Sequence, residues 1–175
     1  MNLPADFITS INLLLGAEAE GFSTSLNENA PVSIRLNPFK IKRNPIEFSL
    51  PTEQVLWSEF GYYLNNRPTF TFDPLFHSGY YYVQEASSMF IEHVVKQLIG
   101  GPVNCLDLCA APGGKSTSLL SSLPEGSLLV SNEIIRQRAN ILSENMVKFG
   151  NPNSVVTNNK PEDFAALPNF FDLIL

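Results

Sequence analysis

The chain has 175 residues, of which 44% are hydrophobic, so it can bury a core in one domain, or in one domain with a small lobe. Its net charge of −6 argues against a general binder of nucleic acids. It contains no apolar run near the ~20 residues that cross a bilayer and no signal peptide, so we expect no membrane partner. Two cysteines and two histidines predict neither a metal site nor a disulfide framework, and indicate a reduced, cytoplasmic protein.

The first half of the chain mixes helical and extended patterns. Apolar residues recur at helical spacing over residues 4–15, and a second helix is expected over 17–26. Alternating residues predict a strand over 32–36. An aromatic-rich stretch over 69–82 predicts a hairpin, whose rings either stack on bases or pack beneath it. A helix is expected over 84–99, with an apolar face of Met89, Phe90, Val94, Val95 and Leu98.

From residue 103 onward, apolar strands alternate with helices. We expect strands over 103–108, 127–133 and 154–158, and a fourth that begins at 171. The helix over 136–149 should turn four side chains inward: Ala139, Leu142, Met146 and Phe149. This order indicates an α/β fold with a parallel sheet and right-handed crossovers, preceded by a small α+β lobe.

The loop after the first parallel strand is the most informative motif. Residues 107–116 read DLCAAPGGKS, an acid followed by small residues, a glycine turn and a helix start. Backbone N–H groups at such a turn can approach a ligand, and the helix dipole favours negative charge there. A phosphate-binding P-loop would need glycine where Cys109 stands, and the dinucleotide fingerprint is absent.

A second acid, Glu133, ends the next apolar run. A carboxylate at the end of a second parallel strand is placed to accept hydrogen bonds from ribose hydroxyls. Because the motif contains neither of these phosphate-binding signatures, an adenosine ligand without phosphates, such as S-adenosylmethionine, fits better than NAD or ATP. Asp107 either caps the loop or faces the sulfonium of such a ligand.

Three segments carry a resemblance to a known family. Residues 107–116, 81–89 (YYVQEASSM) and 32–38 (VSIRLNP) occur in the order found in the RsmB/RsmF and Sun-domain RNA cytosine-C5 methyltransferases, and the chain is most similar to the RsmF-like 16S rRNA enzymes. The resemblance implies an N-terminal RNA-docking lobe over 1–80, a helical connector over 81–102 and the first half of a Rossmann-like methyltransferase domain over 103–175.

The resemblance also implies a set of cofactor-binding residues. S-adenosylmethionine is expected to contact the loop and the acid that follows it, through Cys109, Ala110, Ala111, Pro112, Gly113, Gly114, Lys115, Glu133 and Arg138. Arg138 either steadies Glu133 or simply coats its helix. The family's acid for the adenine amino group corresponds to Lys160, which cannot accept a hydrogen bond. Asn158, Asn159 or Asp163 replaces it, or adenine recognition is weakened.

RNA, and ribosomal RNA in particular, is the expected partner. A basic cluster of Arg35, Lys40, Lys42 and Arg43 is either a solvated strand edge or a phosphate-contacting patch, and the resemblance favours the patch. The family's two catalytic cysteines lie beyond residue 175, so the chain by itself is expected to be inactive, and Cys105 and Cys109 are not catalysts. A methyltransferase for tRNA or another RNA, and a non-catalytic RNA-binding or assembly module, remain alternatives. The sequence gives no oligomeric state.

Overall fold

The computed structural model describes residues 3–42 and 52–175, and the chain divides into two compact units, Met1–Pro31 and Val32–Leu175. The first unit contains α1 (Ala5–Leu15), the 3-10 helix η1 (Gly16–Glu18) and α2 (Ala19–Ser25). The rings of Phe7 and Phe22 lie 6.5 Å apart within it. Both helices predicted for this segment are present, although the second is shorter and begins with a 3-10 turn.

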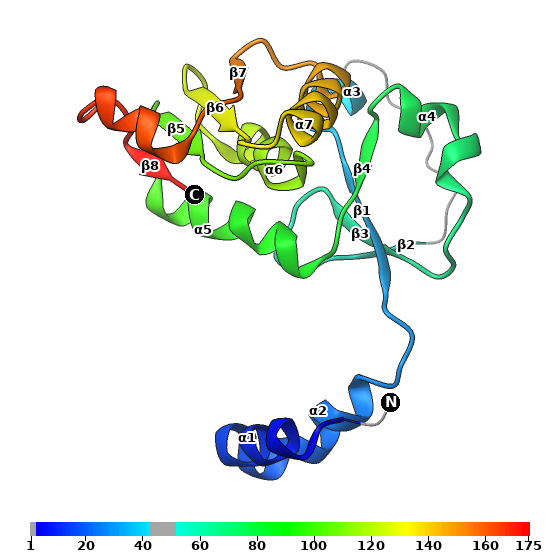
Figure 1. Ribbon diagram of the computed structural model, residues 1–175. Helices are drawn as coiled ribbons and strands as arrows, with labels where there is room; N and C mark the ends of the chain where they lie inside the picture. The colour runs from blue at the N-terminus through cyan, green and yellow to red at the C-terminus, as the bar shows by residue number, and fades with distance from the viewer. Residues whose placement is uncertain (1–2, 43–51) are drawn as a thin grey trace. The chain divides into compact units, whose positions relative to one another are not determined.

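The larger unit begins with an antiparallel sheet (Figure 1). Its strands are β1 (Val32–Leu36), β2 (Thr52–Gln54), β3 (Gly61–Leu64) and β4 (Tyr81–Val83), in the order β2-β3-β1-β4. In β1, an inner strand of this sheet, Ile34 pairs with Tyr62 on one side and with Val83 on the other. The strand predicted over 32–36 is therefore confirmed, and it is buried between neighbours from later in the chain.

The prediction of a hairpin over 69–82 is wrong. The segment instead forms a 3-10 helix, η2 (Phe70–Phe72), and a short helix, α4 (Pro74–His77), before β4 begins. Asp73 is the reason, because its side chain accepts a hydrogen bond of 2.9 Å from the backbone N–H of Leu75 and caps α4. Pro74 fits the first helical turn, where its missing N–H costs nothing.

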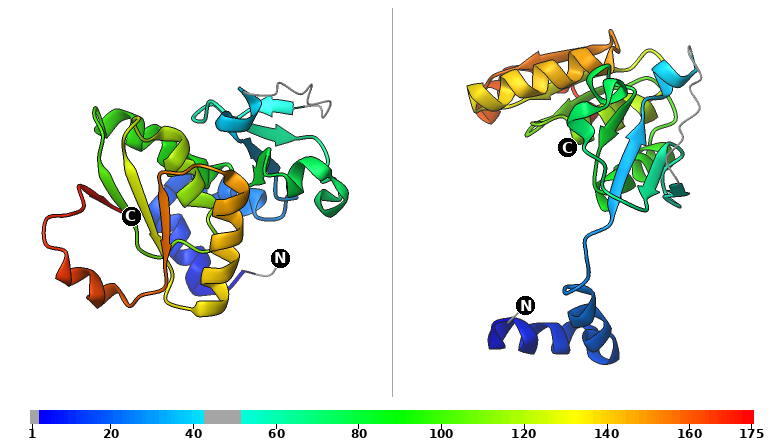
Figure 2. Two further views of the ribbon diagram at one scale, coloured as in Figure 1. Left: turned by 90° about the horizontal axis from the view of Figure 1, so that it is seen from above. Right: turned by 90° about the vertical axis from the view of Figure 1, so that its right-hand side faces the viewer.

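A parallel sheet forms the rest of the unit, as the sequence predicted. The strands β5 (Asn104–Asp107), β6 (Leu128–Asn132), β7 (Ser154–Thr157) and β8 (Leu173–Ile174) lie in the order β7-β6-β5-β8. They are connected by α6 (Gly114–Ser122), α7 (Arg136–Phe149) and the 3-10 helix η4 (Pro161–Ala166). The four side chains expected to point inward from α7 are all buried. Figure 2 shows α7 lying alongside the strands of this sheet. The carboxyl ends of β5 and β6 therefore meet at one edge of the sheet.

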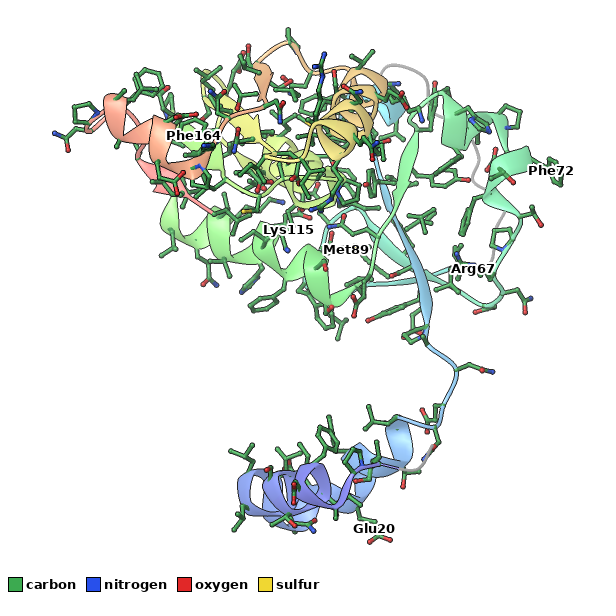
Figure 3. The ribbon with its side chains drawn as sticks, in the orientation of Figure 1. Glu20, Arg67, Phe72, Met89, Lys115 and Phe164 are labelled. Carbon is green, nitrogen blue, oxygen red and sulfur yellow. The ribbon has the colours of Figure 1, made fainter. Side chains whose placement is uncertain are left out.

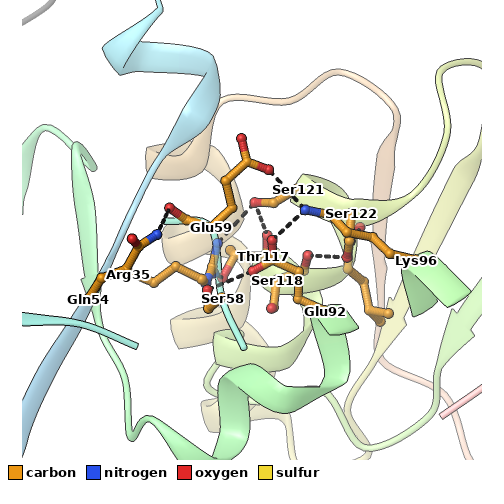
Figure 4. Close-up of polar contacts among 11 residues, drawn as sticks. Arg35, Gln54, Ser58, Glu59, Glu92, Lys96, Thr117, Ser118, Ser121 and Ser122 are labelled. Carbon is orange, nitrogen blue, oxygen red and sulfur yellow. Dashed lines mark hydrogen bonds and ion pairs between the residues drawn. The ribbon is translucent and has the colours of Figure 1, made fainter. Parts of the chain in front are cut away.

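The helix between the two sheets is shorter than the one predicted over 84–99. A 3-10 turn, η3 (Ser87–Met89), leads into α5 (Phe90–Leu98). Met89 and Val95 are buried, but Phe90 and Leu98 are exposed, so the expected apolar face is only partly correct. The helix buries Glu92 instead, whose carboxylate accepts hydrogen bonds from the Ser58 hydroxyl at 2.7 Å and from the Lys96 ammonium at 2.8 Å (Figure 4).

Both sheets belong to one compact unit, Val32–Leu175. Asn37 follows β1, caps α3 (Pro38–Ile41) and donates from its side-chain amide to the carbonyls of Gly79 and Phe149, at 2.9 and 2.8 Å. Phe149 is the last residue of α7, so this buried amide ties the antiparallel sheet to the parallel one. Among the described residues, no helix is long and apolar enough to cross a membrane.

Candidate functional site

The loop after β5 turns sharply into α6. Gly113 adopts a φ of +110°, a left-handed conformation that side chains rarely tolerate, and serves as the N-cap of α6. A Cβ at this position would lie 3.2 Å from Cδ1 of Leu142, so the turn also packs closely against α7. The N–H of Ala110 donates to the Asn132 carbonyl at 2.8 Å, which fixes the loop to the end of β6.

Asp107 has a capping role. Its side chain is buried, and Oδ2 accepts a hydrogen bond of 2.7 Å from the Ser116 hydroxyl in the first turn of α6. Burial raises the pKa of the Asp107 carboxyl, while the Ser116 hydrogen bond, the charge of Lys115 and the backbone N–H of Cys109 counteract this rise. The carboxylate therefore holds the loop and the helix start together.

Glu133 is buried with one oxygen left open. Only 3% of the residue is exposed, and Oε1 accepts a hydrogen bond of 3.0 Å from the N–H of Ile135. Oε2 lies 3.2 Å from Nη1 of Arg138 without the geometry of a hydrogen bond, so this oxygen has a charged neighbour and no donor. Arg138 also donates through Nη2 to the Ala111 carbonyl at 2.7 Å. It therefore connects Glu133 to the loop and does not merely coat α7.

Asn132 is a positioning residue that sequence reasoning missed. It is fully buried, and its amide donates to the carbonyls of Leu108 and Asn159, at 3.2 and 3.0 Å. Its Oδ1 accepts from the Thr157 hydroxyl and from the N–H of Asn159, both at 2.9 Å. One side chain thus holds together the ends of β5, β6 and β7. A polar residue that ends an apolar strand directly before Glu133 was the available signal.

A cavity of about 230 Å³ lies against the loop. It is lined by Cys109, Ala110, Ala111, Pro112, Gly114 and Lys115 from the loop, and by Tyr82, Val83, Gln84, Glu85 and Ser88 from the segment around β4. Lys115 sits at the start of α6, facing α5 in Figure 3. The structure therefore brings the expected loop residues together with segment 82–88, which the sequence analysis noted only for its resemblance to the family. Gln84 was not among the expected binding residues.

The expected basic patch is not one surface. Arg35 is only 1% exposed, so it cannot reach a phosphate, and the prediction that it belongs to the patch is wrong. The same burial lowers the pKa of its guanidinium to about 10. Lys40 donates to the carbonyls of Ser78 and Lys148. Lys42 is exposed, while Arg43 lies outside the described residues. Alternation placed Arg35 on a strand, but it could not show that α6 covers that face.

Arg35 instead connects the two sheets. Its guanidinium donates to Thr117 Oγ1 at 2.6 Å and to Ser121 Oγ at 2.9 Å, both on α6 (Figure 4). The Nε group donates to Gln84 Oε1 at 2.8 Å, and the charge lies 5.7 Å from the centre of the Phe149 ring. All three nitrogens of the guanidinium are thus engaged inside the protein.

A second cavity, of about 330 Å³, lies between the antiparallel sheet and α7. Five of its eleven lining residues are aromatic and two carry a positive charge: Arg67, Phe70, Thr71, Phe76, Gly79, Tyr81, Tyr82, Val83, Asn145, Lys148 and Phe149. The Lys148 ammonium lies 5.9 Å from the centre of the Phe76 ring. This combination of ring faces and positive charge did not follow from the spacing of residues in the sequence.

The end of β7 offers amides where the family has an acid. Asn158 donates to the carbonyls of Glu133 and Ile134, at 2.6 and 3.0 Å, so its own Oδ1 is left as an acceptor. Asp163 is already used, because it accepts from the N–H of Lys160 at 3.0 Å. Lys160 itself is exposed. Asn158 thus offers a neutral hydrogen-bond acceptor next to Glu133.

Cys105 does not have the surroundings of a nucleophile for a bound base. Cys105 is fully buried, and burial together with the charge of Asp107 raises its thiol pKa to about 12. Cys109 is exposed on the loop, and both cysteines are free. Within residues 3–42 and 52–175, no group of three or more His, Cys, Asp or Glu side chains is placed to hold a metal ion.

Comparison with known proteins identifies the family. A model of the N-terminal domain of 16S rRNA methyltransferase RsmF matches residues 3–86, and a model of 16S rRNA methyltransferase RsmB/F matches residues 102–175. The chain belongs to the RsmB/RsmF methyltransferase family. A ribosomal RNA small subunit methyltransferase F of Pectobacterium atrosepticum is 31% identical over 99% of this chain and 38% of the relative. The nsun-1 26S rRNA (cytosine-C(5))-methyltransferase of Caenorhabditis elegans is 28% identical over 91% of this chain and 25% of the relative.

Solved structures support the fold of this RsmB/RsmF member. A methyltransferase homologue from Pyrococcus horikoshii has a TM-score of 0.83 at 23% identity, covering 99% of this chain and 58% of that one. NSun6 from Pyrococcus horikoshii, solved with SFG, has a TM-score of 0.73 at 15% identity and covers 94% of this chain and 67% of that one. The chain spans less than two-fifths of the length of the Pectobacterium relative.

Proposed function

We propose that the edge formed by the ends of β5, β6 and β7 binds S-adenosylmethionine. The observation that carries the proposal is Glu133, a buried carboxylate with one open acceptor beside a glycine turn. Two vicinal hydroxyls of a ribose are the donors that such a carboxylate accepts. Arg138 holds the carboxylate in place and anchors the loop at Ala111. The bound cofactor supplies the methyl group.

Asn158 would recognise the adenine. Its free Oδ1 can accept a hydrogen bond from an exocyclic amino group, and its amide is fixed on the backbone of Glu133 and Ile134. Lys160 in the position of the family's acid would then leave recognition weaker, since a neutral amide replaces a charged acceptor.

The reaction that this family membership supports is methylation of cytosine C5 in ribosomal RNA by the whole protein. Both the bacterial and the nematode relative are named as rRNA methyltransferases. This chemistry needs a thiolate that adds to the base. The thiol of Cys105, buried and with a raised pKa, does not suit that role. This chain contributes the cofactor site and part of the RNA surface, in the reducing cytoplasm that suits two free cysteines.

RNA would dock beside the 330 Å³ cavity, not along the expected basic run. Arg67 and Lys148 line this cavity together with the rings of Phe76 and Tyr82. Ring faces accept stacked bases, and the cations attract the phosphates that flank them. The exposed Lys42 adds a phosphate contact. Arg43 remains a candidate from the sequence alone.

Titration calorimetry tests the cofactor site directly. The intact protein is expected to bind S-adenosylmethionine and S-adenosylhomocysteine, and not ATP or NAD, because the loop lacks a phosphate cradle. Transfer of a radioactive methyl group from S-adenosylmethionine to purified 16S rRNA by the whole protein tests the reaction. Binding without transfer to any RNA would favour the alternative of a non-catalytic assembly module, to which Lys160 points. Transfer to tRNA alone would change the substrate and leave the cofactor site intact.

A further inference from the structure

Gln84 is a buried amide whose orientation is fixed. It is 7% exposed, and its backbone is held by β1, since Gln84 N–H donates to the Ser33 carbonyl and the Ser33 hydroxyl donates to the Gln84 carbonyl at 2.6 Å. The side-chain oxygen accepts the hydrogen bond of 2.8 Å from Arg35 Nε. Rotating the amide by half a turn would place its NH₂ against that N–H donor. Arg35 therefore sets which end of Gln84 faces outward.

The end that faces outward has no partner among the described residues. Nε2 of Gln84 is buried and makes no hydrogen bond, although a buried donor without an acceptor is costly. The residue lines the 230 Å³ cavity beside the loop. Nε2 also lies close to the start of α6, at 3.7 Å from where a Cβ on Gly114 would stand. A donor has thus been placed and left open at the wall of a cavity.

The groups around this donor indicate which kind of ligand the cavity could bind. Gly114 and Lys115, in the first turn of α6, line the same cavity, so the positive end of the helix dipole and a cationic side chain lie beside it. With Nε2 of Gln84, they suit an anionic acceptor such as a carboxylate. Glu85, the acid in the lining, offers a partner for an adjacent ammonium. Together these charges match the zwitterionic head of an amino acid.

We propose that Gln84 donates a hydrogen bond to the carboxylate of the methionine end of the cofactor, an inference that rests on the proposed S-adenosylmethionine site. The loop connects the two ends of the ligand: Arg138 ties Glu133 to the Ala111 carbonyl, and Ala111 lines the cavity of Gln84. A single molecule with a ribose at one end and a carboxylate at the other fits this arrangement. Arg35 acts through Gln84 as a positioning residue.

The test compares two nucleosides that differ in the amino-acid tail. S-adenosylhomocysteine carries the carboxylate, whereas 5′-methylthioadenosine keeps the adenosine and lacks the tail. Their dissociation constants are measured by calorimetry on the intact protein, for the wild type and for Gln84→Met. The substitution should weaken S-adenosylhomocysteine by about 10- to 100-fold, the range for a hydrogen bond to a charged group, and leave methylthioadenosine unchanged. Gln97→Met, at an exposed position of α5, is the matched control and should change neither.

A second variant guards against loss of folding. Gln84→Glu keeps an oxygen for Arg35 and places a negative charge where the amide stood, so it should fold and weaken S-adenosylhomocysteine even further. Equal losses for both nucleosides, or no loss for either, would overturn the role of Gln84. Unchanged nucleoside affinity with weakened RNA binding would assign Gln84 to the RNA instead and also overturn it. A wild-type protein that binds neither nucleoside would refute the cofactor site itself.

Discussion

Two buried charges, Arg35 in the antiparallel sheet and Glu133 at the edge of the parallel sheet, are equally hidden but unequally satisfied. Arg35 is 1% exposed and Glu133 is 3% exposed. Every nitrogen of the Arg35 guanidinium donates to an oxygen of the protein, whereas Oε2 of Glu133 has no donor. A saturated buried charge holds a structure together, and an unsaturated one is available to a ligand. Burial alone does not distinguish the two roles.

The largest effect is expected at the saturated charge. Arg35→Met removes the donors to Gln84, Thr117 and Ser121 and should lower the free energy of unfolding by about 3–5 kcal/mol, as when one partner of a buried polar network is lost. Urea unfolding measures the change. Lys42→Met, at an exposed position, should stay within ~0.5 kcal/mol. If the Arg35→Met protein has normal stability but has lost affinity for RNA, Arg35 binds RNA and is not a structural residue.

The unsaturated charge should behave in the opposite way. Glu133→Gln keeps an oxygen for the N–H of Ile135 but removes the charge that would accept from ribose hydroxyls. Its affinity for S-adenosylhomocysteine should fall by about 1.5–3 kcal/mol, the value of hydrogen bonds to a charged group, with little loss of stability. Calorimetry and urea unfolding on the same preparation separate the two quantities. A variant that unfolds more easily and binds normally would show that Glu133 is structural.

The glycine turn that leads from β5 into α6 can be tested at Gly113. Gly113→Ala places a Cβ at a φ of +110° and 3.2 Å from Leu142, and should lower the free energy of unfolding by about 1–3 kcal/mol. Gly100→Ala is the matched control, because a Cβ there meets no atom within 4 Å. That substitution should change stability by less than ~1 kcal/mol. Similar results for both variants would show that the turn can relax.

The smallest effect concerns Asp107, whose pKa is raised by burial. An acid with a raised pKa in the folded state contributes its stability when protonated and loses it as the pH rises through that pKa. Asp107→Asn does not titrate and keeps an oxygen for the Ser116 hydroxyl. Its stability relative to the wild type should therefore increase as the pH rises above the ordinary carboxyl value of 3.8, and level off once Asp107 is ionised. Urea unfolding at a series of pH values measures this difference, and a constant difference would contradict it.

The parallel half of the fold could be predicted because its signals are local. Apolar strands, the glycine turn and the inward face of α7 each depend on residues close in sequence, and all were confirmed. Of the antiparallel half, only β1 could be predicted, because its partners β3 and β4 lie far along the chain. The aromatic residues before β4 suggested a strand, but the cap at Asp73 decided for a helix.

The same division holds for the site. The sequence by itself determined the glycine turn, the place of Glu133 directly after the second parallel strand and the family to which the chain belongs, since the turn and the strand end depend on residue types at fixed spacing. Only the tertiary structure decided that Arg35 is buried, that Asn132 holds three strand ends, and that Gln84 turns a free N–H toward the loop. The physical reason is that a hydrogen bond between distant segments is set by how the sheets pack together, and no spacing in the sequence records it.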